Sequence, residues 1–260
     1  MLFFASDFHL GLRTPRPARL RENLAVQWLR SIYPQCEQLF LLGDTFDFWY
    51  EYRHVIPKGH TRFLATLCQF ADSGKKVHIF VGNHDVWLHS YLEQEVGATI
   101  YRQPTRFSLN GHTIYMAHGD GLGPGGYGYK LLKACFHNRA LQALFYLVHP
   151  DLAMALGLSW SYRGRHAKQY SLPFRQEREP IVAYTQHLLR QQPAQLYLYG
   201  HMHIPIIYQL NGTTPPAYLA ILGDWITHDT YAQLDGDTFS LWQYRANQPP
   251  QLLQQCTLTQ

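Results

Sequence analysis

The sequence predicts an α/β fold of layered sheets, and three features of the chain support this prediction. In the first part of the chain, short apolar segments alternate with segments of helical periodicity, which is typical of an α/β sheet. Later apolar segments follow one another closely and favour a second, more antiparallel sheet. The chain has 260 residues, of which 46% are hydrophobic and 15% charged, so it can bury a full core.

Three strands and two helices are expected at the start of the chain. Apolar runs at 1–6, 38–42 and 77–81 predict buried strands. Between them, residues 16–33 and 61–73 carry apolar residues at helical spacing and predict helices. A glycine directly after the second of these segments is a typical helix stop.

The rest of the chain divides into a helical segment and further strands. Residues 125–192 show no strand pattern; they are helix-like and rich in Tyr, Arg and His. The apolar runs that predict further strands lie at 112–117, 195–199, 218–222 and 238–244. We therefore expect a core formed by residues 1–124 and 193–260, into which residues 125–192 are inserted as a helical cap.

Composition and charge narrow the classes of protein to be considered. Lys and Arg number 22 against 18 Asp and Glu, and no block of like charge occurs, so nucleic-acid binding is not expected. The first residues lack the basic segment of a secretory signal, and no apolar run approaches the roughly 20 residues of a bilayer span. Four scattered cysteines without a CxxC pair disfavour a zinc finger or a disulfide framework. We expect a cytoplasmic protein, and its 15 histidines point to metal.

Most of the predicted strands are followed by Asp, Asn or His, usually beside a glycine. The motifs are Asp7-Phe8-His9, Gly43-Asp44-Thr45-Phe46-Asp47, Gly82-Asn83-His84-Asp85, His118-Gly119-Asp120 and Gly200-His201-Met202-His203. Ligand sites in α/β sheets gather at the carboxyl ends of strands, so these loops are expected to converge. Asp, Asn and imidazole without thiolate suit Mn²⁺, Zn²⁺ or Fe²⁺. A single strand-end Asp or His is more often a loop cap, but the ordered set favours a metal site.

The ordered motifs D-x-H, G-D-x-x-D, G-N-H-D, H-G and G-H-x-H resemble those of the calcineurin-like metallophosphoesterases. The resemblance implies a four-layer αββα sandwich and two divalent ions. It assigns Asp7, His9, Asp44 and His203 to the first ion and Asp44, Asn83, His118 and His201 to the second, with Asp44 bridging. It also implies catalytic roles for Asp44, Asn83 and His84, of which His84 lies beside the scissile phosphate.

The reaction that this resemblance implies is two-metal hydrolysis of a phosphoester. Two ions activate a water for in-line attack on phosphorus, while His84 and backbone donors help to stabilise the developing charge. Asp47, Asp85 and Asp120 have two possible roles at this stage: they orient the ligands, or they cap loops.

Flanking residues resemble more narrowly the UDP-2,3-diacylglucosamine hydrolases. The similar segments are 6–11, 42–49 and 118–122. The resemblance implies cleavage of UDP-2,3-diacylglucosamine to UMP and 2,3-diacylglucosamine 1-phosphate in lipid A biosynthesis, with Mn²⁺, by a peripheral protein on the cytoplasmic face of the inner membrane. A general nucleotide pyrophosphatase or phosphodiesterase on the same site is the alternative. A non-catalytic scaffold is disfavoured, because every ligand position is filled.

Two positions depart from that narrower pattern. The best-known members have Arg where this chain has His84, which gives G-N-H-D in place of G-N-R-D. Gly125 and Gly126 replace an acidic residue that is expected near this position for substrate contact.

The predicted cap offers candidate substrate contacts. Three roles are open for its apolar residues: to line an acyl groove, to seat the protein on a bilayer, or to pack the cap against the core. These residues are Leu131, Leu132, Phe136, Leu141, Leu144, Phe145, Leu147 and Val148. The basic residues Arg163, Arg165, His166 and Lys168 bind phosphate or the uridine side, or form a solvated face. Gly223-Asp224-Trp225, after a predicted strand, is assigned no role.

Overall fold

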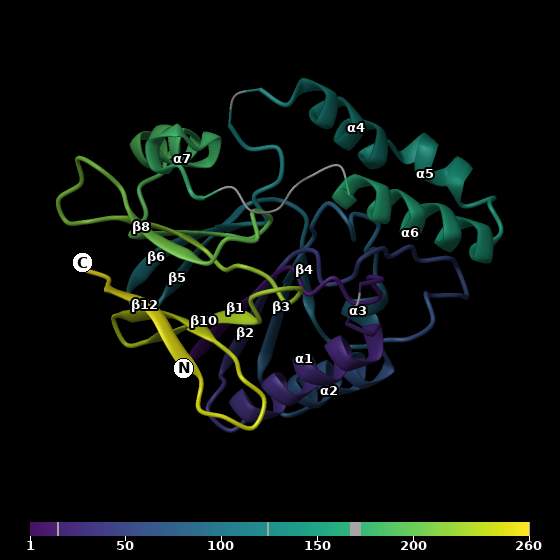
Figure 1. Cartoon of the computed structure of the whole chain (residues 1–260), viewed down its shortest axis with the longest axis horizontal. Helices are drawn as coiled ribbons and strands as arrows, with labels where there is room; N and C mark the ends of the chain where they lie inside the picture. Colours follow the sequence, from purple (N-terminus) through teal and green to yellow (C-terminus); the bar gives the residue numbers. More distant parts are fainter. Residues whose placement is uncertain (15, 124, 167–172, 260) are drawn as a thin grey trace.

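Two mixed sheets form the centre of the molecule in the computed structural model (Figure 1). The structure describes residues 1–14, 16–123, 125–166 and 173–259, and it describes no side chains for residues 163–166. The first sheet has the order β12-β11-β10-β1-β2-β3-β4, and the second has the order β5-β6-β7-β9-β8. The strands of the first sheet are β1 (Leu2–Ala5), β2 (Gln38–Leu42), β3 (Lys76–Phe80), β4 (Thr99–Tyr101), β10 (Thr230–Asp235), β11 (Thr238–Gln243) and β12 (Gln251–Thr257). Those of the second are β5 (Thr105–Leu109), β6 (His112–Ala117), β7 (Leu196–Tyr199), β8 (Ile206–Gln209) and β9 (Tyr218–Ile221).

The two sheets pack face to face because their strands are apolar on both faces. In β1, Leu2 and Phe4 point into the core between the sheets, and Phe3 and Ala5 point to the opposite face. Strands β1 to β4 pair in parallel, and so do β6, β7 and β9. Parallel strands are usually buried on both faces, which explains their continuous apolar runs in the sequence.

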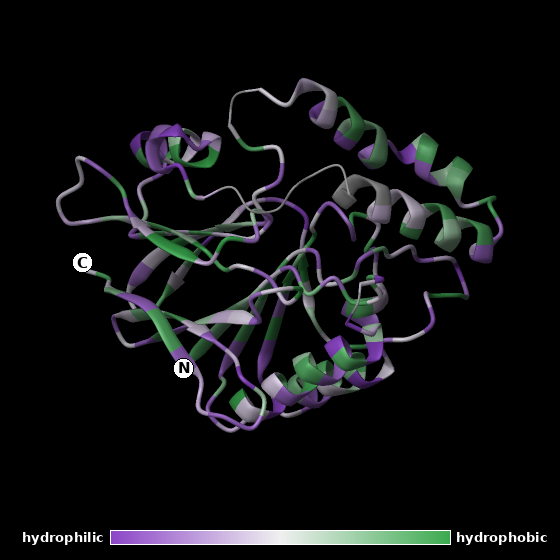
Figure 2. Cartoon of the chain, viewed as in Figure 1, coloured by the Kyte–Doolittle hydropathy of each residue, from purple (hydrophilic) through white to green (hydrophobic). Residues whose placement is uncertain are grey.

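Helices cover the outer face of each sheet. On the first sheet lie α1 (Ala18–Ile32) and α2 (Thr61–Asp72), which bury Trp28, Phe63 and Phe70 against it. On the second lies α7 (Pro180–Gln191), through Ile181 and Val182. Figure 2 shows the apolar sides of these helices turned toward the sheets. The predicted four-layer αββα fold is therefore confirmed.

A separate group of helices lies beyond one end of the sheets (Figure 1). It contains α4 (Tyr127–His137), α5 (Arg139–Phe145) and α6 (Pro150–His166); the short elements α3 (Tyr91–Gln94) and η1 (Gln176–Arg178) lie elsewhere. Side chains from the loop after β2 hold this group: the Tyr50 hydroxyl donates to the Gln142 carbonyl (2.9 Å) and the Tyr52 hydroxyl to the Val148 carbonyl (2.8 Å). A search of the described residues finds no helix long and apolar enough to cross a membrane.

Candidate active site

The five motif loops follow β1, β2, β3, β6 and β7, and they meet at the carboxyl ends of these strands. Because β1, β2 and β3 are parallel, as are β6 and β7, each sheet presents the ends of its motif strands at one edge. The predicted convergence of these loops is observed.

Three overlapping groups of side chains form the centre of the site. They are Asp7–His9–His203, His9–Asp44–His84 and Asp44–His118–His201, and within each group the ligand atoms lie within 4.8 Å of one another. Asp44 belongs to two of the groups, with its Oδ2 3.4 Å from His118 Nε2 and 3.6 Å from His9 Nε2. Asn83 joins them through its Oδ1, which lies 3.2 Å from His118 Nε2. All the residues predicted as metal ligands therefore lie in one cluster.

The donor atoms in this cluster fit divalent ions. Asp7 Oδ1 is buried and has no hydrogen-bond partner among the described atoms, a costly arrangement for a carboxylate oxygen. His203 Nε2 lies 3.3 Å and His9 Nε2 3.7 Å from it. Ligands at about 2.0–2.2 Å from one ion lie roughly 3–3.5 Å apart, so these separations are close to those of a shared ion. Carboxylate, amide and imidazole donors suit Mn²⁺, Fe²⁺ or Zn²⁺.

The backbone of the cluster adopts a rare conformation. Positive φ angles occur at Asp7 (56°), His9 (45°), Asp44 (50°), His201 (65°) and His203 (58°). Residues with side chains seldom occupy this left-handed region, and such strain concentrates at functional sites. Gly200 is required for close packing here, because a Cβ at this position would lie 2.6 Å from Asp7 Oδ2.

Burial and mutual charge shift the pKa values of these groups. Burial alone lowers the pKa of His203, but Asp7 and Asp224 outweigh it and raise the value to about 10. Burial and the neighbouring His118 lower the pKa of His201 to about 4. Burial raises the pKa of Asp44, but His118 and His84 outweigh it and hold the value well below its usual range. Since metal ligands must be deprotonated, ion binding displaces protons from this cluster.

Three nearby aspartates take different positions around the cluster. Asp85 caps loops, since it accepts hydrogen bonds from the backbone N–H groups of Gly82 (2.7 Å) and Thr45 (2.8 Å). Asp47 Oδ1 lies 3.4 Å from His9 Nδ1, the ring nitrogen remote from Asp7 and Asp44. Asp120 faces the helix α4, where it accepts a hydrogen bond from the Tyr129 hydroxyl.

Asp224 is a further member of the site, although the sequence analysis gave it no role. Its Oδ2 lies 3.0 Å from His203 Nδ1, and its Oδ1 accepts backbone N–H groups of residues 226–228. A carboxylate on the second ring nitrogen fixes the tautomer and orientation of a metal-binding histidine. The signal in the sequence was the pair Gly-Asp directly after an apolar strand, the same pattern that marks Asp44.

Asp224→Asn is expected to weaken Mn²⁺ binding about 10- to 100-fold, because the amide accepts the Nδ1 proton less strongly than a carboxylate does. The measurement is the Mn²⁺ concentration that half-saturates activity, and excess Mn²⁺ should restore turnover. Asp235→Asn, at an exposed position on β10, is the matched control. An unchanged Mn²⁺ requirement in Asp224→Asn would contradict this role.

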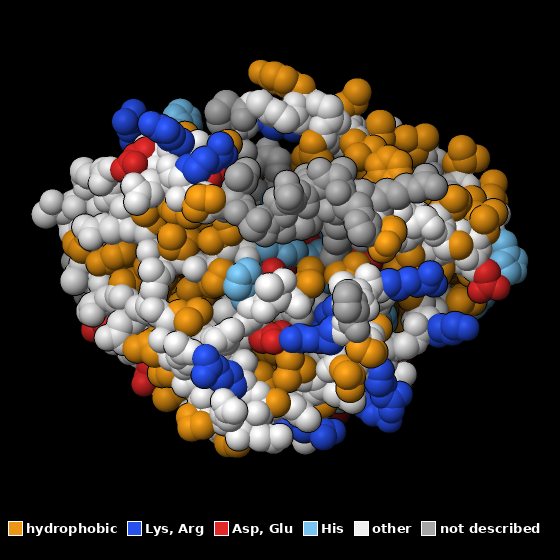
Figure 3. Space-filling view, viewed as in Figure 1, with side chains coloured by type: hydrophobic (Ala, Val, Ile, Leu, Met, Phe, Trp, Pro, Cys, Tyr) orange, Lys and Arg blue, Asp and Glu red, His pale blue; other side chains and the backbone are white. Residues whose placement is uncertain are grey.

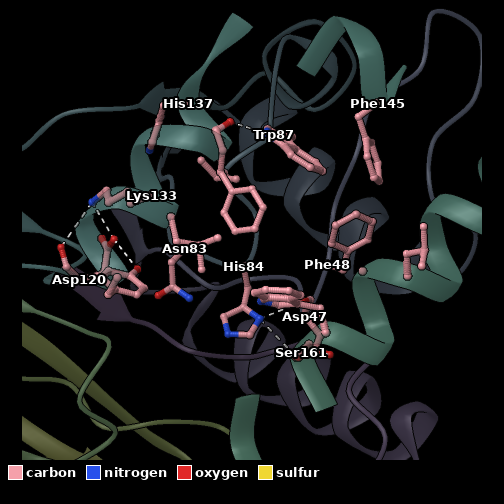
Figure 4. Close-up of a pocket in the computed structure, with 17 residues that line it drawn as sticks. Asp47, Phe48, Asn83, His84, Trp87, Asp120, Lys133, His137, Phe145 and Ser161 are labelled. Atoms are coloured by element: carbon pink, nitrogen blue, oxygen red, sulfur yellow. Dashed lines mark hydrogen bonds and ion pairs between the residues drawn. The ribbon is translucent and has the colours of Figure 1, made fainter. Parts of the chain in front are cut away.

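A cavity of about 290 Å³ opens beside His84 and extends under the helices α4 to α6 (Figure 4). The polar residues of its lining are Asp47, Asn83, His84, Asp120, Tyr129, Lys133, His137 and Ser161. The other lining residues are Phe48, Val86, Trp87, Leu132, Phe136, Phe145, Leu156, Gly157 and Trp160. We call this space the cap cavity.

Side chains of α4 and α6 reach the site directly. Lys133 Nζ lies 2.6 Å from Asp120 Oδ2, and the Tyr129 hydroxyl donates to the same carboxylate (2.9 Å). Ser161 on α6 donates to Asp47 (2.9 Å). Tyr129, Lys133 and His137 are spaced four residues apart on α4, a period that could have identified this face from the sequence.

The basic residues that were predicted to contact the substrate lie outside the part of the chain whose side chains the structure describes. Lys168 lies outside the described residues, and the side chains of Arg163, Arg165 and His166 lie outside the described part of α6. Their roles stay predictions.

Comparison with known proteins identifies the family. Residues 2–205 match the model of the calcineurin-like phosphoesterases. A protein of Porphyromonas gingivalis named UDP-2,3-diacylglucosamine hydrolase is 33% identical over 254 residues, which cover 92% of this chain and 96% of that protein. Proteins of the same name from Ectopseudomonas mendocina and Proteus mirabilis are each 26% identical, over 92% and 93% of this chain and 96% and 98% of their own lengths.

Among solved structures, vacuolar protein sorting 29 from Cryptosporidium parvum matches with a TM-score of 0.47 and 12% identity, covering 98% of this chain and 97% of that one. A likeness this weak supports no conclusion about the site. The family model spans the ordered motifs from Asp7 to His203, whose side chains meet in one cluster. The chain belongs to the calcineurin-like phosphoesterases and is a metal-dependent phosphoester hydrolase.

Proposed function

We propose that the chain cleaves the pyrophosphate of UDP-2,3-diacylglucosamine to UMP and 2,3-diacylglucosamine 1-phosphate, a step of lipid A biosynthesis. The observation that carries this proposal is the position of the cap cavity, which places an apolar space directly beside the metal-ligand cluster. The names of the relatives support the same substrate.

The lining of the cap cavity fits a substrate with acyl chains. Its lining combines aromatic and aliphatic side chains with a smaller set of hydrogen-bonding groups, among them Asn83, His84 and Lys133. Pockets that bind amphipathic ligands commonly have this combination. Leu156 and Trp160 line the cavity and are also 52% and 59% exposed, so its apolar surface continues to the outside of the cap. An acyl chain longer than the cavity would therefore remain on apolar surface.

In this proposal, Asp7, His9, Asp44 and His203 hold one divalent ion and Asp44, Asn83, His118 and His201 hold the other. When bound, two such ions polarise the phosphoryl group and lower the pKa of a bound water. We assign Mn²⁺ as the ion, on the oxygen and imidazole donors of the cluster. Asp224 and Asp47 contact the second ring nitrogens of His203 and His9 and would keep these imidazoles oriented.

His84 is proposed to contact the scissile phosphate. Its Nδ1 lies 3.0 Å from the Asp47 carbonyl oxygen, which can only accept, so Nδ1 carries a proton. This bond fixes the ring beside the cavity (Figure 4). A fixed imidazole that can take up a second proton is suited to stabilise charge that develops on the phosphoryl oxygens.

The helices α4 to α6 are proposed to form a cap that seats the protein on the cytoplasmic face of the inner membrane. Large apolar side chains are exposed on them, among them Tyr127 (81%), Leu131 (69%), Leu144 (63%) and Leu147 (79%). Figure 3 shows apolar side chains gathered over these helices. Aromatic and leucine side chains at an interface bind bilayers by burying apolar area. The division into core (1–124 and 193–260) and cap (125–192) remains part of this proposal, and α7 packs on the second sheet.

The test is hydrolysis of UDP-2,3-diacylglucosamine with added Mn²⁺, beside UDP-GlcNAc and bis-p-nitrophenyl phosphate. We expect UMP release from the acylated substrate and little from UDP-GlcNAc, because only the former fills the cap cavity. Equal turnover of both UDP sugars would contradict the proposal and favour a general nucleotide pyrophosphatase. The controls separate a lost substrate preference from a lost metal site, because bis-p-nitrophenyl phosphate needs only the latter.

A further inference from the structure

A second cavity, of about 300 Å³, lies next to the metal-ligand cluster, with His118 in its lining. It is bounded by the end of β3, the turn between β4 and β5, and the loop after β6. Its walls include Phe80, Tyr101, Arg102, Gln103, Pro104 and His118. We call it the β4–β5 cavity.

The two cavities adjoin at the cluster. Asp120, Lys133 and His137 line both, and the Lys133–Asp120 ion pair (2.6 Å) stands at their common border. The cap cavity contains Asn83 and the β4–β5 cavity contains His118, whose side chains lie 3.2 Å apart. A molecule that spans both cavities would therefore pass beside Asn83 and His118, two of the proposed metal ligands.

The chemistry of the two linings differs. Rings and aliphatic chains make up much of the cap-cavity lining, whereas Arg102 and Gln103 line the β4–β5 cavity alone and Lys133 lines both. The Gln103 amide supplies both a donor and an acceptor, as the imide edge of a pyrimidine requires. The Tyr101 ring stacks on Phe80 and adds an aromatic wall to the cavity, and lysine is a common phosphate ligand. This combination suits a nucleotide better than an acyl chain.

Arg102 is held in place at the rim of this cavity. Its guanidinium donates to the Leu88 carbonyl (3.4 Å) and the His89 carbonyl, and it lies 3.8 Å from Glu93. A cation anchored in this way loses less side-chain entropy when an anion or a carbonyl oxygen binds nearby. Gln103 is exposed and its side chain can turn toward a ligand.

On the basis of the function proposed above, we propose that the β4–β5 cavity binds the nucleoside monophosphate half of the substrate. The diacylglucosamine half then lies in the cap cavity, and the pyrophosphate crosses the cluster between them. Each product leaves from its own cavity: UMP from the β4–β5 cavity and 2,3-diacylglucosamine 1-phosphate from the cap cavity.

The test measures the binding of each product separately, by calorimetry on the Mn²⁺-loaded full chain. Gln103→Trp places bulk in the β4–β5 cavity and is expected to weaken UMP binding about tenfold or more, while 2,3-diacylglucosamine 1-phosphate binds within about twofold of wild type. Trp160→Ala is expected to show the reverse. Arg106→Trp, at an exposed position on β5 outside the lining, adds the same bulk and should change neither.

Arg102→Ala provides a second variant that removes a cation instead of adding bulk, and it should also weaken UMP selectively. Wild-type UMP affinity in both Gln103→Trp and Arg102→Ala would overturn the inference. So would hydrolysis of the acylated substrate by a chain that binds no UMP, and that result would leave the proposed function standing. The converse result is UMP binding that depends on Gln103 in a chain that does not hydrolyse the acylated substrate. That result would support a nucleotide site and overturn the proposed function.

Discussion

Asp44→Ala is expected to abolish turnover, with a loss of at least about a thousandfold, and to lower the number of ions bound per chain. Asp44 is the carboxylate that belongs to two of the three ligand groups, and its Oδ2 lies 3.4 Å from His118 Nε2 and 3.6 Å from His9 Nε2. Metal ions supply several kcal/mol of charge stabilisation in such reactions, and about 4 kcal/mol corresponds to a thousandfold in rate.

The measurement for Asp44→Ala combines kcat with the metal content after dialysis against Mn²⁺. Asp44 Oδ1 also accepts the backbone N–H of His84 (2.8 Å), so Asp44→Asn should be measured beside it to keep a hydrogen-bond acceptor there. Asp235→Ala, at an exposed site, controls for the loss of an acidic residue. Wild-type metal content in Asp44→Ala would show that this residue does not bridge two ions.

His84→Ala is expected to keep its metal and to lose about 100- to 1,000-fold in kcat, the range for loss of one donor to a developing oxyanion. The ring lies edge-on to His9, with centroids 4.8 Å apart, but its Nδ1 is engaged by the Asp47 carbonyl at 3.0 Å. Its removal therefore leaves the proposed ligands of both ions in place.

His84→Arg is the informative companion to this variant, because an arginine restores a donor and a positive charge at the same position. We expect it to recover part of the activity that His84→Ala loses. Both variants are assayed with saturating Mn²⁺, and the ion content is measured in parallel. Near wild-type turnover in His84→Ala would remove this residue from the chemistry.

The sequence predicted the strands that consist of a run of apolar, buried residues. Strands β1, β2 and β3 are buried and apolar, so their periodicity was sufficient. Strand β12 reads Gln-Leu-Leu-Gln-Gln-Cys-Thr, is largely exposed, and lies at the sheet edge, where backbone pairing with β11 holds it. Strand β5 is a half-exposed edge strand of the same kind. No apolar pattern marks such strands, and both were missed. The short strands β4 and β8 and the buried strand β10, in which Gln233 and Asp235 interrupt the apolar residues, were missed as well.

The site likewise contains residues that the sequence predicted and residues that it did not. The ligand motifs were predictable because each follows a strand, and parallel strands bring their carboxyl ends to one edge of a sheet. The contact of Lys133 with Asp120 could not be predicted from the sequence, because the two residues belong to different parts of the fold, α4 and the loop after β6. Asp224 contacts His203 from 21 residues away in the chain, after a strand that pairs beside β7. Its role depends on sheet order, which local sequence does not record.

These strand-end loops are proposed to hold two ions that share Asp44. The most direct test is anomalous scattering from crystals of the chain grown with Mn²⁺. Two peaks are predicted, one among Asp7, His9, Asp44 and His203, and the other among Asp44, Asn83, His118 and His201. A single peak, or peaks away from these side chains, would contradict the assignment of two ions that share Asp44.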